Sequence, residues 1–240
     1  GPQTGVFIGG KDALLALDMM KAAKEAMVPP FELSVFADPA GSFTTAAAMV
    51  ACVEKVLKTK FNRDWKGVKV AVFGATGVVG FASSIIAALE GADVQLVAHR
   101  GVDRVIKSAT ISKERFGVDL EAVPGETDDQ KRDIIANAEV IFAAAAAGVQ
   151  VVSKEHKELA KNLKVIADVN AVPPAGVEGM GLFMNGEPLP GCAALGVGPL
   201  AIGDVKYKTE SGLFKQMIAS DKPVQFDFRD AFKLARSIVG

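Results

Sequence analysis

The stretch that decides the fold is Val70-Ala71-Val72-Phe73-Gly74-Ala75-Thr76-Gly77-Val78-Val79-Gly80. The apolar run before Gly74 predicts a buried strand, and the spacing after it predicts a helix. Gly74 permits a tight turn, Gly77 lets the backbone approach a pyrophosphate, and Gly80 lets the helix pack close to the strand. The free N–H groups at the start of the helix favour an anion. A tight turn without a ligand is the alternative, but a βαβ context favours a dinucleotide site.

The rest of the chain repeats this alternation of short β-branched runs with longer helical patterns, which is typical of parallel α/β structure. After the glycine stretch we expect strands at 68–73, 93–98, 118–122, 139–143 and 164–168, with helices at 79–89, 103–116, 128–136 and 154–161. A Gly-rich loop, a helix through Gly212–Ile218 and an amphipathic helix from Asp227 complete the chain. The pattern predicts a Rossmann-type doubly wound parallel sheet.

The first part of the chain predicts a second, smaller α/β lobe. Strands are expected at 5–9 and 31–36, a helix at 11–27, and a long helix at 44–60 that joins the two lobes. We expect residues 1–45 to form this lobe only incompletely and the C-terminal helix of 222–240 to complete it. Residues 46–221 then form the NADP-binding domain, which includes the interlobe helix.

Composition and charge exclude several classes of protein. The chain has 240 residues, half of them hydrophobic, with 27 basic and 28 acidic side chains and a net charge of −1. A nucleic-acid partner usually requires a basic excess, and no apolar run reaches the roughly 20 residues of a membrane span. No signal peptide is visible, because Lys11 and Asp12 follow the first apolar run at once. We therefore expect a cytoplasmic enzyme without nucleic-acid or membrane partners.

Few side chains are available for acid–base or metal chemistry. The chain has two histidines, His99 and His156, and one tyrosine, Tyr207. Its two cysteines, Cys52 and Cys192, have no metal or redox spacing. We expect no metal site and no histidine-based triad, so the reaction must need little proton transfer.

The end of the strand 93–98 indicates which dinucleotide binds. Sites for NAD place an acidic residue there, whereas this strand ends in His99-Arg100. Arg100 can hold a 2′-phosphate, and Arg104 or Lys107 can add to it. NADP is favoured and use of NAD stays open; a solvated arginine is the alternative for Arg100. Ala144 and Ala145 belong to a stretch of small residues, 143–148, whose backbone can lie against the ribose and nicotinamide. The alternative is that the small residues are the start of a helix and serve packing alone.

Several blocks together resemble a known family, the NAD(P)-dependent methylene-tetrahydromethanopterin dehydrogenases. Besides the glycine stretch, these blocks are Asp38-Pro39-Ala40-Gly41-Ser42-Phe43-Thr44-Thr45-Ala46-Ala47-Ala48, Ala167-Asp168-Val169-Asn170-Ala171-Val172-Pro173-Pro174-Ala175-Gly176 and Ala194-Leu195-Gly196-Val197-Gly198. The family is related to the methylene-tetrahydrofolate dehydrogenases. Val28-Pro29-Pro30-Phe31 and Phe226-Asp227-Phe228-Arg229-Asp230 resemble its tetrahydromethanopterin-specific branch.

The resemblance implies a reaction that matches the sparse inventory of acids and bases. Oxidation of a methylene bridge between two nitrogens transfers a hydride to the nicotinamide, and the nitrogen lone pairs stabilise the resulting cation. The protein then supplies mainly positioning and electrostatics. The resemblance also implies that a segment which helps form the pterin site precedes this chain in the family, and that the protein is a homo-oligomer in one-carbon metabolism.

The resemblance also implies where each ligand lies. The pterin is expected in the cleft between the lobes, where it is positioned by Asp38, Ser42, Thr44, Thr45 and Lys206. The alternative for Thr44 is a helix N-cap without ligand contact, and the alternative for Lys206 is an ordinary surface lysine. Asn170 is expected to face the nicotinamide, with an Asx turn as its alternative. The complete predicted cofactor set is Gly74, Thr76, Gly77, Val78, Val79, Gly80, His99, Arg100, Arg104, Ala144, Ala145, Asn170, Gly196 and Gly198.

Three other functions stay open at this point. The first is a methylene-tetrahydrofolate dehydrogenase, and the second is another NADP-linked reductase, acting on a quinone or a shikimate-like substrate. The third, from another class, is a non-catalytic NADP-binding protein. The 38–45 block favours the pterin dehydrogenase over the second, and turnover of a methylene-pterin would exclude the third.

Overall fold

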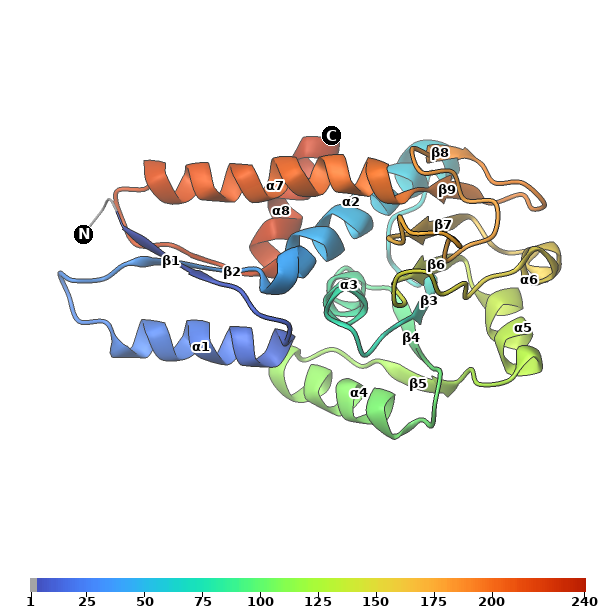
Figure 1. Ribbon diagram of the computed structural model, residues 1–240, viewed down its shortest axis with the longest axis horizontal. Helices are drawn as coiled ribbons and strands as arrows, with labels where there is room; N and C mark the ends of the chain where they lie inside the picture. The colour runs from blue at the N-terminus through green and yellow to red at the C-terminus, as the bar shows by residue number, and fades with distance from the viewer. Residues whose placement is uncertain (1–3) are drawn as a thin grey trace.

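The computed structural model describes residues 4–240, and within them the strands form one sheet of three and one of seven (Figure 1). All neighbours in the larger sheet pair in parallel except β8, which is antiparallel to β9. The chain enters the sheet centrally at β3, moves outward to β5 and returns to β6, which is the Rossmann strand order. In sheet order the strands are β5 (Glu121–Pro124), β4 (Asp93–Ala98), β3 (Lys69–Phe73), β6 (Val140–Ala143), β7 (Val165–Asp168), β9 (Leu195–Val197) and β8 (Asn185–Pro188).

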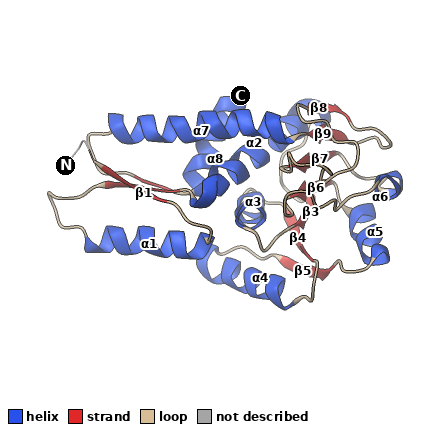
Figure 2. Cartoon of the chain, viewed as in Figure 1, coloured by secondary structure: helices blue, strands red, loops and turns tan. Residues whose placement is uncertain are grey.

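Helices cover both faces of the larger sheet (Figures 1 and 2). On one face lie α3 (Val78–Leu89) and α4 (Asp103–Phe116), and on the other lie α5 (Asp128–Asn137) and α6 (Lys154–Leu159). The inner strands β3, β6 and β7 are almost completely buried, as expected for a parallel sheet between two helical layers. The predicted doubly wound Rossmann-type sheet is confirmed.

The small sheet contains segments from both ends of the chain. Its order is β1-β2-β10, all parallel, with β1 at Gly5–Ile8, β2 at Ser34–Ala37 and β10 at Gln225–Phe226. The helix α1 (Ala13–Ala26) lies on one face and the long α7 (Pro199–Ala219) on the other (Figure 1). Phe214 of α7 packs its ring 5.4 Å from Phe7 and 5.2 Å from Phe36, measured between ring centroids. The residue limits of two separate domains stay a prediction.

The helix α2 (Ser42–Phe61) lies between the two sheets and packs against α3, α7 and α8 (Phe228–Val239). Small side chains such as Ala46, Ala47 and Ala48, all fully buried, let these helices approach closely. The helical segment Pro39–Phe61 is long and apolar enough to cross a membrane by length and composition, which the sequence analysis did not expect. In that segment 72% of the apolar window is buried within the protein, so its hydrophobicity is accounted for by core packing.

A buried ion pair joins α2 to the C-terminal helix. Glu54 of α2 is 4% exposed and accepts two hydrogen bonds from Arg236 of α8, at 2.6 Å from Nε and 2.9 Å from one terminal nitrogen. Arg236 also pairs with Glu90 at the end of α3, and its guanidinium lies 4.3 Å from the centre of the Phe232 ring. Three helices are therefore held by one planar cation.

Several element boundaries differ from those predicted. Helix α7 begins at Pro199, whereas the sequence predicted a helix only through Gly212–Ile218. Gly203 and Gly212 disfavour a helix locally, but a Cβ at Gly212 would lie 2.8 Å from Leu234, so glycine there allows α7 and α8 to pack closely. Strand β5 lies three residues later than predicted at its start. Strands β8, β9 and β10 were missed, because they are short and carry no alternating pattern.

We expect Arg236→Ala to lower the free energy of unfolding by about 1.5–3 kcal/mol, because the buried Glu54 carboxylate loses two charge-assisted hydrogen bonds and keeps only the exposed Lys58, at 3.1 Å, as a counter-charge. Urea unfolding at neutral pH measures this loss. Lys233→Ala is the matched control: Lys233 lies on the same helix but is exposed and pairs only weakly with Asp230, at 3.4 Å. An equal effect of both substitutions would show that the buried pair contributes nothing specific.

Candidate functional site

The glycine stretch forms the turn between β3 and α3. Gly74 has a φ of +79°, and a Cβ there would overlap the carbonyl group of Ala144, which follows β6. A Cβ on Gly80 would overlap the carbonyl group of Gly74. Both positions therefore require glycine for reasons internal to the protein. This is the tight turn and close strand–helix approach that the sequence predicts.

Gly77 differs from the other two glycines because it is open on its outer side. Its φ is negative, it precedes α3 directly, and a Cβ would meet only the Gly74 oxygen at 3.3 Å. No side chain caps α3, so the N–H groups of its first turn remain available to an anion. Thr76, Gly77 and Val78 line a hollow of about 220 Å³. Val79 instead packs partly against the core.

A cavity of about 400 Å³ continues from this turn along the ends of β3, β4 and β6. It is lined by ten or more small or apolar residues together with the cations Arg100, Arg104 and Lys131, and no carboxylate lines it. Of the predicted cofactor set, its walls contain Gly74, Thr76, His99, Arg100, Arg104 and Ala145. The turn at Gly74 and Gly77, where neither residue carries a side chain, fits the pyrophosphate of a dinucleotide. The three cations of the cavity wall match the negative charge of its phosphates.

A larger hollow of about 750 Å³ lies at the opposite ends of β3, β4 and β5. Its walls carry four carboxylates, Asp93, Asp119, Glu121 and Asp133, against the single cation Lys69. These carboxylates would repel a phosphate, so electrostatics assigns a dinucleotide to the smaller cavity.

The connection after β4 is tied to the connection after β5. Glu126 accepts a 2.9 Å hydrogen bond from the N–H of Gly101, and Gly125 donates through its N–H to the oxygen of Ala98. His99 and Arg100 are exposed at this corner. The loop that carries Arg100 is therefore held beside the loop that leads into α5.

The structure gives Asn170 a different environment from the predicted one. Its side chain is 6% exposed, accepts bonds from the N–H groups of Gly148 and Val172, and donates to the oxygen of Pro174. All its polar atoms are thus used within the protein, and the bond to Val172 is an Asx turn. Asn170 therefore holds the loop after β6 against the loop after β7, and a contact with a nicotinamide stays a prediction. Ala144, another residue of the predicted cofactor set, lies directly beside the glycine turn, with its carbonyl group next to Gly74.

Gly196 and Gly198 are also placed differently from the prediction. Both are buried, and neither lines the nucleotide cavity. A Cβ on Gly196 would lie 2.9 Å from the sulfur of Met184, and one on Gly198 would overlap the oxygen of Gly181. These glycines allow the 180–184 segment to pack on β9 and the start of α7, so their role is internal packing.

The loop before α2 contains most of the predicted substrate residues. Asp38 is 1% exposed and accepts hydrogen bonds from the N–H groups of Phe43 and Thr44, and from the Thr44 hydroxyl at 2.6 Å. Thr44 is fully buried and lies in the first turn of α2, so it is not the predicted N-cap. Asp38 and Thr44 therefore stabilise the start of α2, and their burial and internal hydrogen bonds favour this structural role over contact with a substrate.

Ser42, Thr45 and Lys206 remain as candidates to contact a substrate. The structure brings Lys206 of α7 to this loop, since a Cβ on Gly41 would lie 3.1 Å from its ammonium nitrogen. Lys206 also pairs with Glu210, one turn later on α7. Ser42 is half-buried, and the Thr45 hydroxyl donates to the Gly41 oxygen at 2.7 Å. Gly41 and Lys206, which are far apart in the chain, thus meet at one corner between the sheets.

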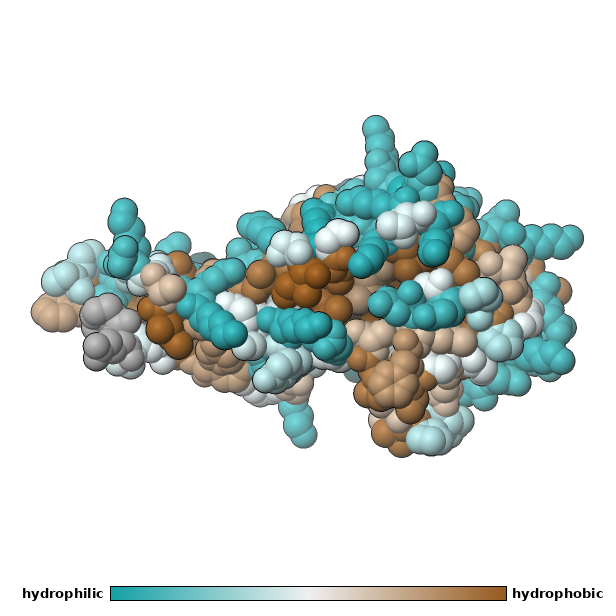
Figure 3. All heavy atoms as spheres, turned by 90° about the horizontal axis from the view of Figure 1, so that it is seen from above, coloured by the Kyte–Doolittle hydropathy of each residue, from teal (hydrophilic) through white to brown (hydrophobic). Residues whose placement is uncertain are grey.

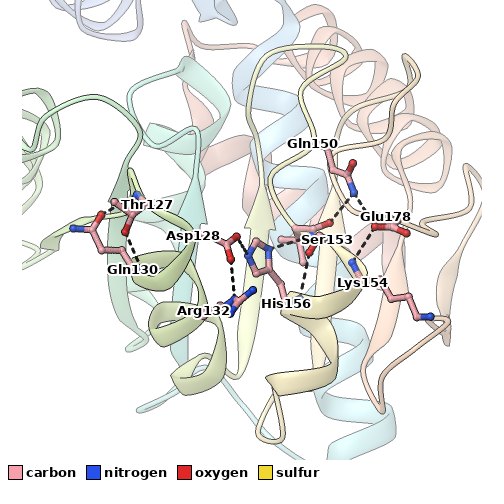
Figure 4. Close-up of polar contacts among 10 residues, drawn as sticks. Thr127, Asp128, Gln130, Arg132, Gln150, Ser153, Lys154, His156 and Glu178 are labelled. Atoms are coloured by element: carbon pink, nitrogen blue, oxygen red, sulfur yellow. Dashed lines mark hydrogen bonds and ion pairs between the residues drawn. The ribbon is translucent and has the colours of Figure 1, made fainter.

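His156 lies in a buried contact between α5 and α6 (Figure 4). Its Nδ1 accepts from the N–H of Ser153, so its Nε2 carries the proton and donates to Asp128 at 2.8 Å. His156 is thus used structurally. Within residues 4–240, no three His, Cys, Asp or Glu side chains form a group that could hold a metal ion.

The sequence analysis missed the part of the cavity wall that comes from beyond β5 and β6. Lys131 of α5 and the segment 149–151 line the cavity. The strand order could have predicted these residues, because the connections that follow adjacent parallel strands lie at the same edge of the sheet.

Fold and cavity define a dinucleotide-dependent oxidoreductase of the Rossmann class, and comparisons with known proteins agree. The chain is 50% identical over 240 residues to the NAD(P)-dependent methylenetetrahydromethanopterin dehydrogenase of Methylorubrum extorquens, covering 100% of this chain and 81% of the relative. The chain belongs to this dehydrogenase family. A family model described as methylene-tetrahydromethanopterin dehydrogenase, N-terminal, matches residues 1–40.

Two further comparisons are consistent with this assignment. The chain is 32% identical over 235 residues to the bifunctional protein MdtA of the same organism, covering 98% of this chain and 79% of the relative. A solved structure of L-alanine dehydrogenase superposes with a TM-score of 0.50 at 15% identity, covering 90% of this chain and 82% of that one. The latter likeness concerns the fold alone.

We expect Gly77→Val to weaken NADP binding roughly a hundredfold, about 2.7 kcal/mol, because the branched side chain projects from the open side of the turn onto the α3 N–H groups. Isothermal calorimetry measures the affinity, and thermal unfolding should show an intact fold. Gly203→Val is the control, since Gly203 also has free space around it but lies on α7. Undiminished affinity in a folded Gly77→Val protein would exclude this turn as the phosphate site.

Burial raises the pKa of the Asp38 carboxyl above its ordinary value of 3.8, against the opposing effect of the bonds from Thr44 and Phe43. The folded state therefore binds this proton more tightly, so the contribution to stability is present below the unfolded pKa and is lost as pH rises through the folded pKa. We expect the free energy of unfolding of Asp38→Asn, relative to the wild type, to be higher at neutral pH than near pH ~4. Urea unfolding at both pH values tests this, and a pH-independent difference would contradict it.

Proposed function

We propose that this protein oxidises methylene-tetrahydromethanopterin to methenyl-tetrahydromethanopterin with NAD(P), within one-carbon metabolism of formaldehyde. The observation that carries the proposal is the 50% identity over the whole chain to a dehydrogenase of that name. The cation-lined cavity and the glycine turn supply the cofactor half of the site. The Ser42–Lys206 corner supplies the substrate half.

The chemistry needs only a hydride acceptor and correct placement. A bound NAD(P) would supply the acceptor for a hydride from the methylene carbon, and the two adjacent nitrogens of the pterin would stabilise the cation that is left. One hydride leaves and no separate proton moves, so no side chain has to act as a base. This agrees with the internal bonding of His156 and with the position of His99 at the adenosine end of the cavity.

The residues of this chain bind and orient the two reactants. Gly74 and Gly77, with the first turn of α3, would hold the pyrophosphate, and Ala144 and Ala145 would let the nicotinamide half lie against the backbone after β6. Ser42, Thr45 and Lys206 would orient the pterin, with Glu210 fixing the Lys206 ammonium. Holding two reactants in the correct orientation can lower the activation barrier by several kcal/mol. Positioning the reactants is therefore enough for these residues to accelerate the reaction.

The assignment of NADP, with NAD as a second substrate, rests on charge. The carboxylate that NAD sites place after the second strand is replaced here by Arg100, and the cavity has cations but no acidic wall. A 2′-phosphate would find complementary charge there, whereas the ribose hydroxyls of NAD would lack their usual acceptor.

We also propose a cytoplasmic homo-oligomer with the two-lobe division 1–45 plus 222–240 and 46–221. The pairing of β10 with β2 supports the lobe composition. Seen from the side of α7 (Figure 3), hydrophobic side chains interrupt the polar surface, and Leu200, Phe214 and Ile218 of α7 are exposed. Phe214 and Ile218 are one turn apart and line one hollow with Phe7 and Met217, and a contiguous exposed apolar patch of this kind is typical of subunit contacts.

An absorbance assay of reduced nicotinamide tests the function. The purified protein is mixed with methylene-tetrahydromethanopterin or methylene-tetrahydrofolate and with NADP or NAD. We expect the fastest reduction with the methanopterin. Turnover of the folate alone would identify the related dehydrogenase, and NADP binding without turnover of either pterin would identify a non-catalytic binding protein.

We expect Arg100→Ala to raise the KM for NADP much more than the KM for NAD, because only NADP loses a phosphate contact. One charge-assisted hydrogen bond corresponds to about 1.5–3 kcal/mol. Steady-state kinetics with both cofactors measures the two changes, and Lys107→Ala, outside the cavity wall, serves as the control for lost positive charge. Equal weakening for both cofactors would remove Arg100 from the phosphate site.

A further inference from the structure

Lys131 is a cation of the nucleotide cavity that the glycine pattern does not predict. It lies in the second turn of α5, is half-buried, and lines the same wall as Arg100 and Arg104 of the β4–α4 region. Among the described residues 4–240, no hydrogen bond or ion pair joins the side chain of any of these three cations to a carboxylate. The cavity thus holds three positive side chains whose charge the protein does not neutralise.

Two acids at the start of α5, Asp128 and Glu126, make contacts with other groups. Asp128, three residues earlier on α5, lies between His156 and Arg132 in Figure 4, at 2.8 Å from each. Both contacts hold its carboxylate on the α6 side of α5. Glu126 is engaged by the N–H of Gly101. Asp128 therefore makes its close contacts with His156 and Arg132, and the charge of Lys131 acts on it without an ion-pair contact.

The same contacts bring Lys131 close to the arginines. The Glu126–Gly101 bond and the bond from Gly125 to Ala98 fasten the β5–α5 loop to the β4–α4 loop. Three like charges around a cavity of about 400 Å³ repel one another, and an anion placed among them relieves this repulsion. A phosphate monoester brings about two negative charges, whereas a ribose hydroxyl brings none.

We propose that Lys131 is a specificity-determining residue that binds the 2′-phosphate of NADP together with Arg100 and Arg104. This inference rests on the proposed nucleotide site. It adds a phosphate-binding side chain from α5 to the two arginines that follow β4. It accounts for a half-buried lysine whose side chain makes no hydrogen bond or ion-pair contact within residues 4–240. Discrimination between NADP and NAD is then shared between two loops.

The test compares two fragments of the cofactor that differ only in the phosphate, 2′,5′-ADP and ADP. Their affinities for the whole chain are measured by isothermal calorimetry. We expect Lys131→Gln to weaken 2′,5′-ADP about tenfold or more and to change ADP less than about twofold, since only the former loses a charge-assisted contact. Lys131→Arg should retain most of the discrimination. The fold of each variant is checked by thermal unfolding.

Lys107→Gln is the matched control, because it removes the same charge from neighbouring α4 without altering the cavity wall. An equal loss for both ligands in Lys131→Gln would place Lys131 against the adenosine and overturn the inference, as would no loss at all. If Lys107→Gln weakened 2′,5′-ADP as much as Lys131→Gln does, the loss would come from the lower overall positive charge and not from a direct contact. That outcome would also overturn the inference. If the wild type bound neither fragment, the nucleotide site itself would be refuted, and this inference with it.

Discussion

β3 and β6 lie side by side with their following loops in contact because residue 74 has no side chain. A Cβ there would overlap the carbonyl group of Ala144, and the φ of +79° would strain any other residue. Gly80 repeats the constraint one turn later, where α3 lies against the turn itself. The open start of α3, the cavity at the ends of β3, β4 and β6, and the position of Ala144 all depend on this close approach.

A second constraint acts between the two sheets. Helix α2 is buried along its length and is surrounded by α3, α7 and α8, so its small side chains set the spacing of three other helices. The Glu54–Arg236–Glu90 contacts join the interior of α2 to the C-terminal ends of α3 and α8. Because the loop of Gly41 leads into α2 and Lys206 lies on α7, the packing of α2 on α7 creates the corner where a substrate is proposed to bind.

Local sequence predicted the cofactor half of the site better than the substrate half. The glycine turn and Arg100 lie in a single βαβ unit, and their placement follows from the geometry of that unit. Asp38, Thr44 and Asn170 were expected to face ligands, but each is bonded to nearby backbone or to another of these side chains. Short polar side chains in loops have several partners within reach, and only the folded loop decides which one they bind.

Gly196 and Gly198 show the same limit for glycine. A glycine in a loop can accommodate either a ligand or another part of the protein, and here Met184 and Gly181 occupy the space. Lys131 shows the reverse case. Nothing in its local sequence marks it, and it reaches the cavity because the connections after β4 and β5 lie at one edge of the sheet.

The sequence by itself determined the doubly wound sheet, the position of the phosphate turn and the dehydrogenase family. The sheet and the turn follow from hydrophobic periodicity and glycine spacing, which act over a few residues, whereas the family follows from the resemblance of several longer sequence blocks. Tertiary structure decided the full length of α7, the meeting of Lys206 with the Gly41 loop, and the group of cations around Lys131. Each of these depends on packing between segments far apart in the chain, where burial of apolar surface and pairing of charge outweigh local preference.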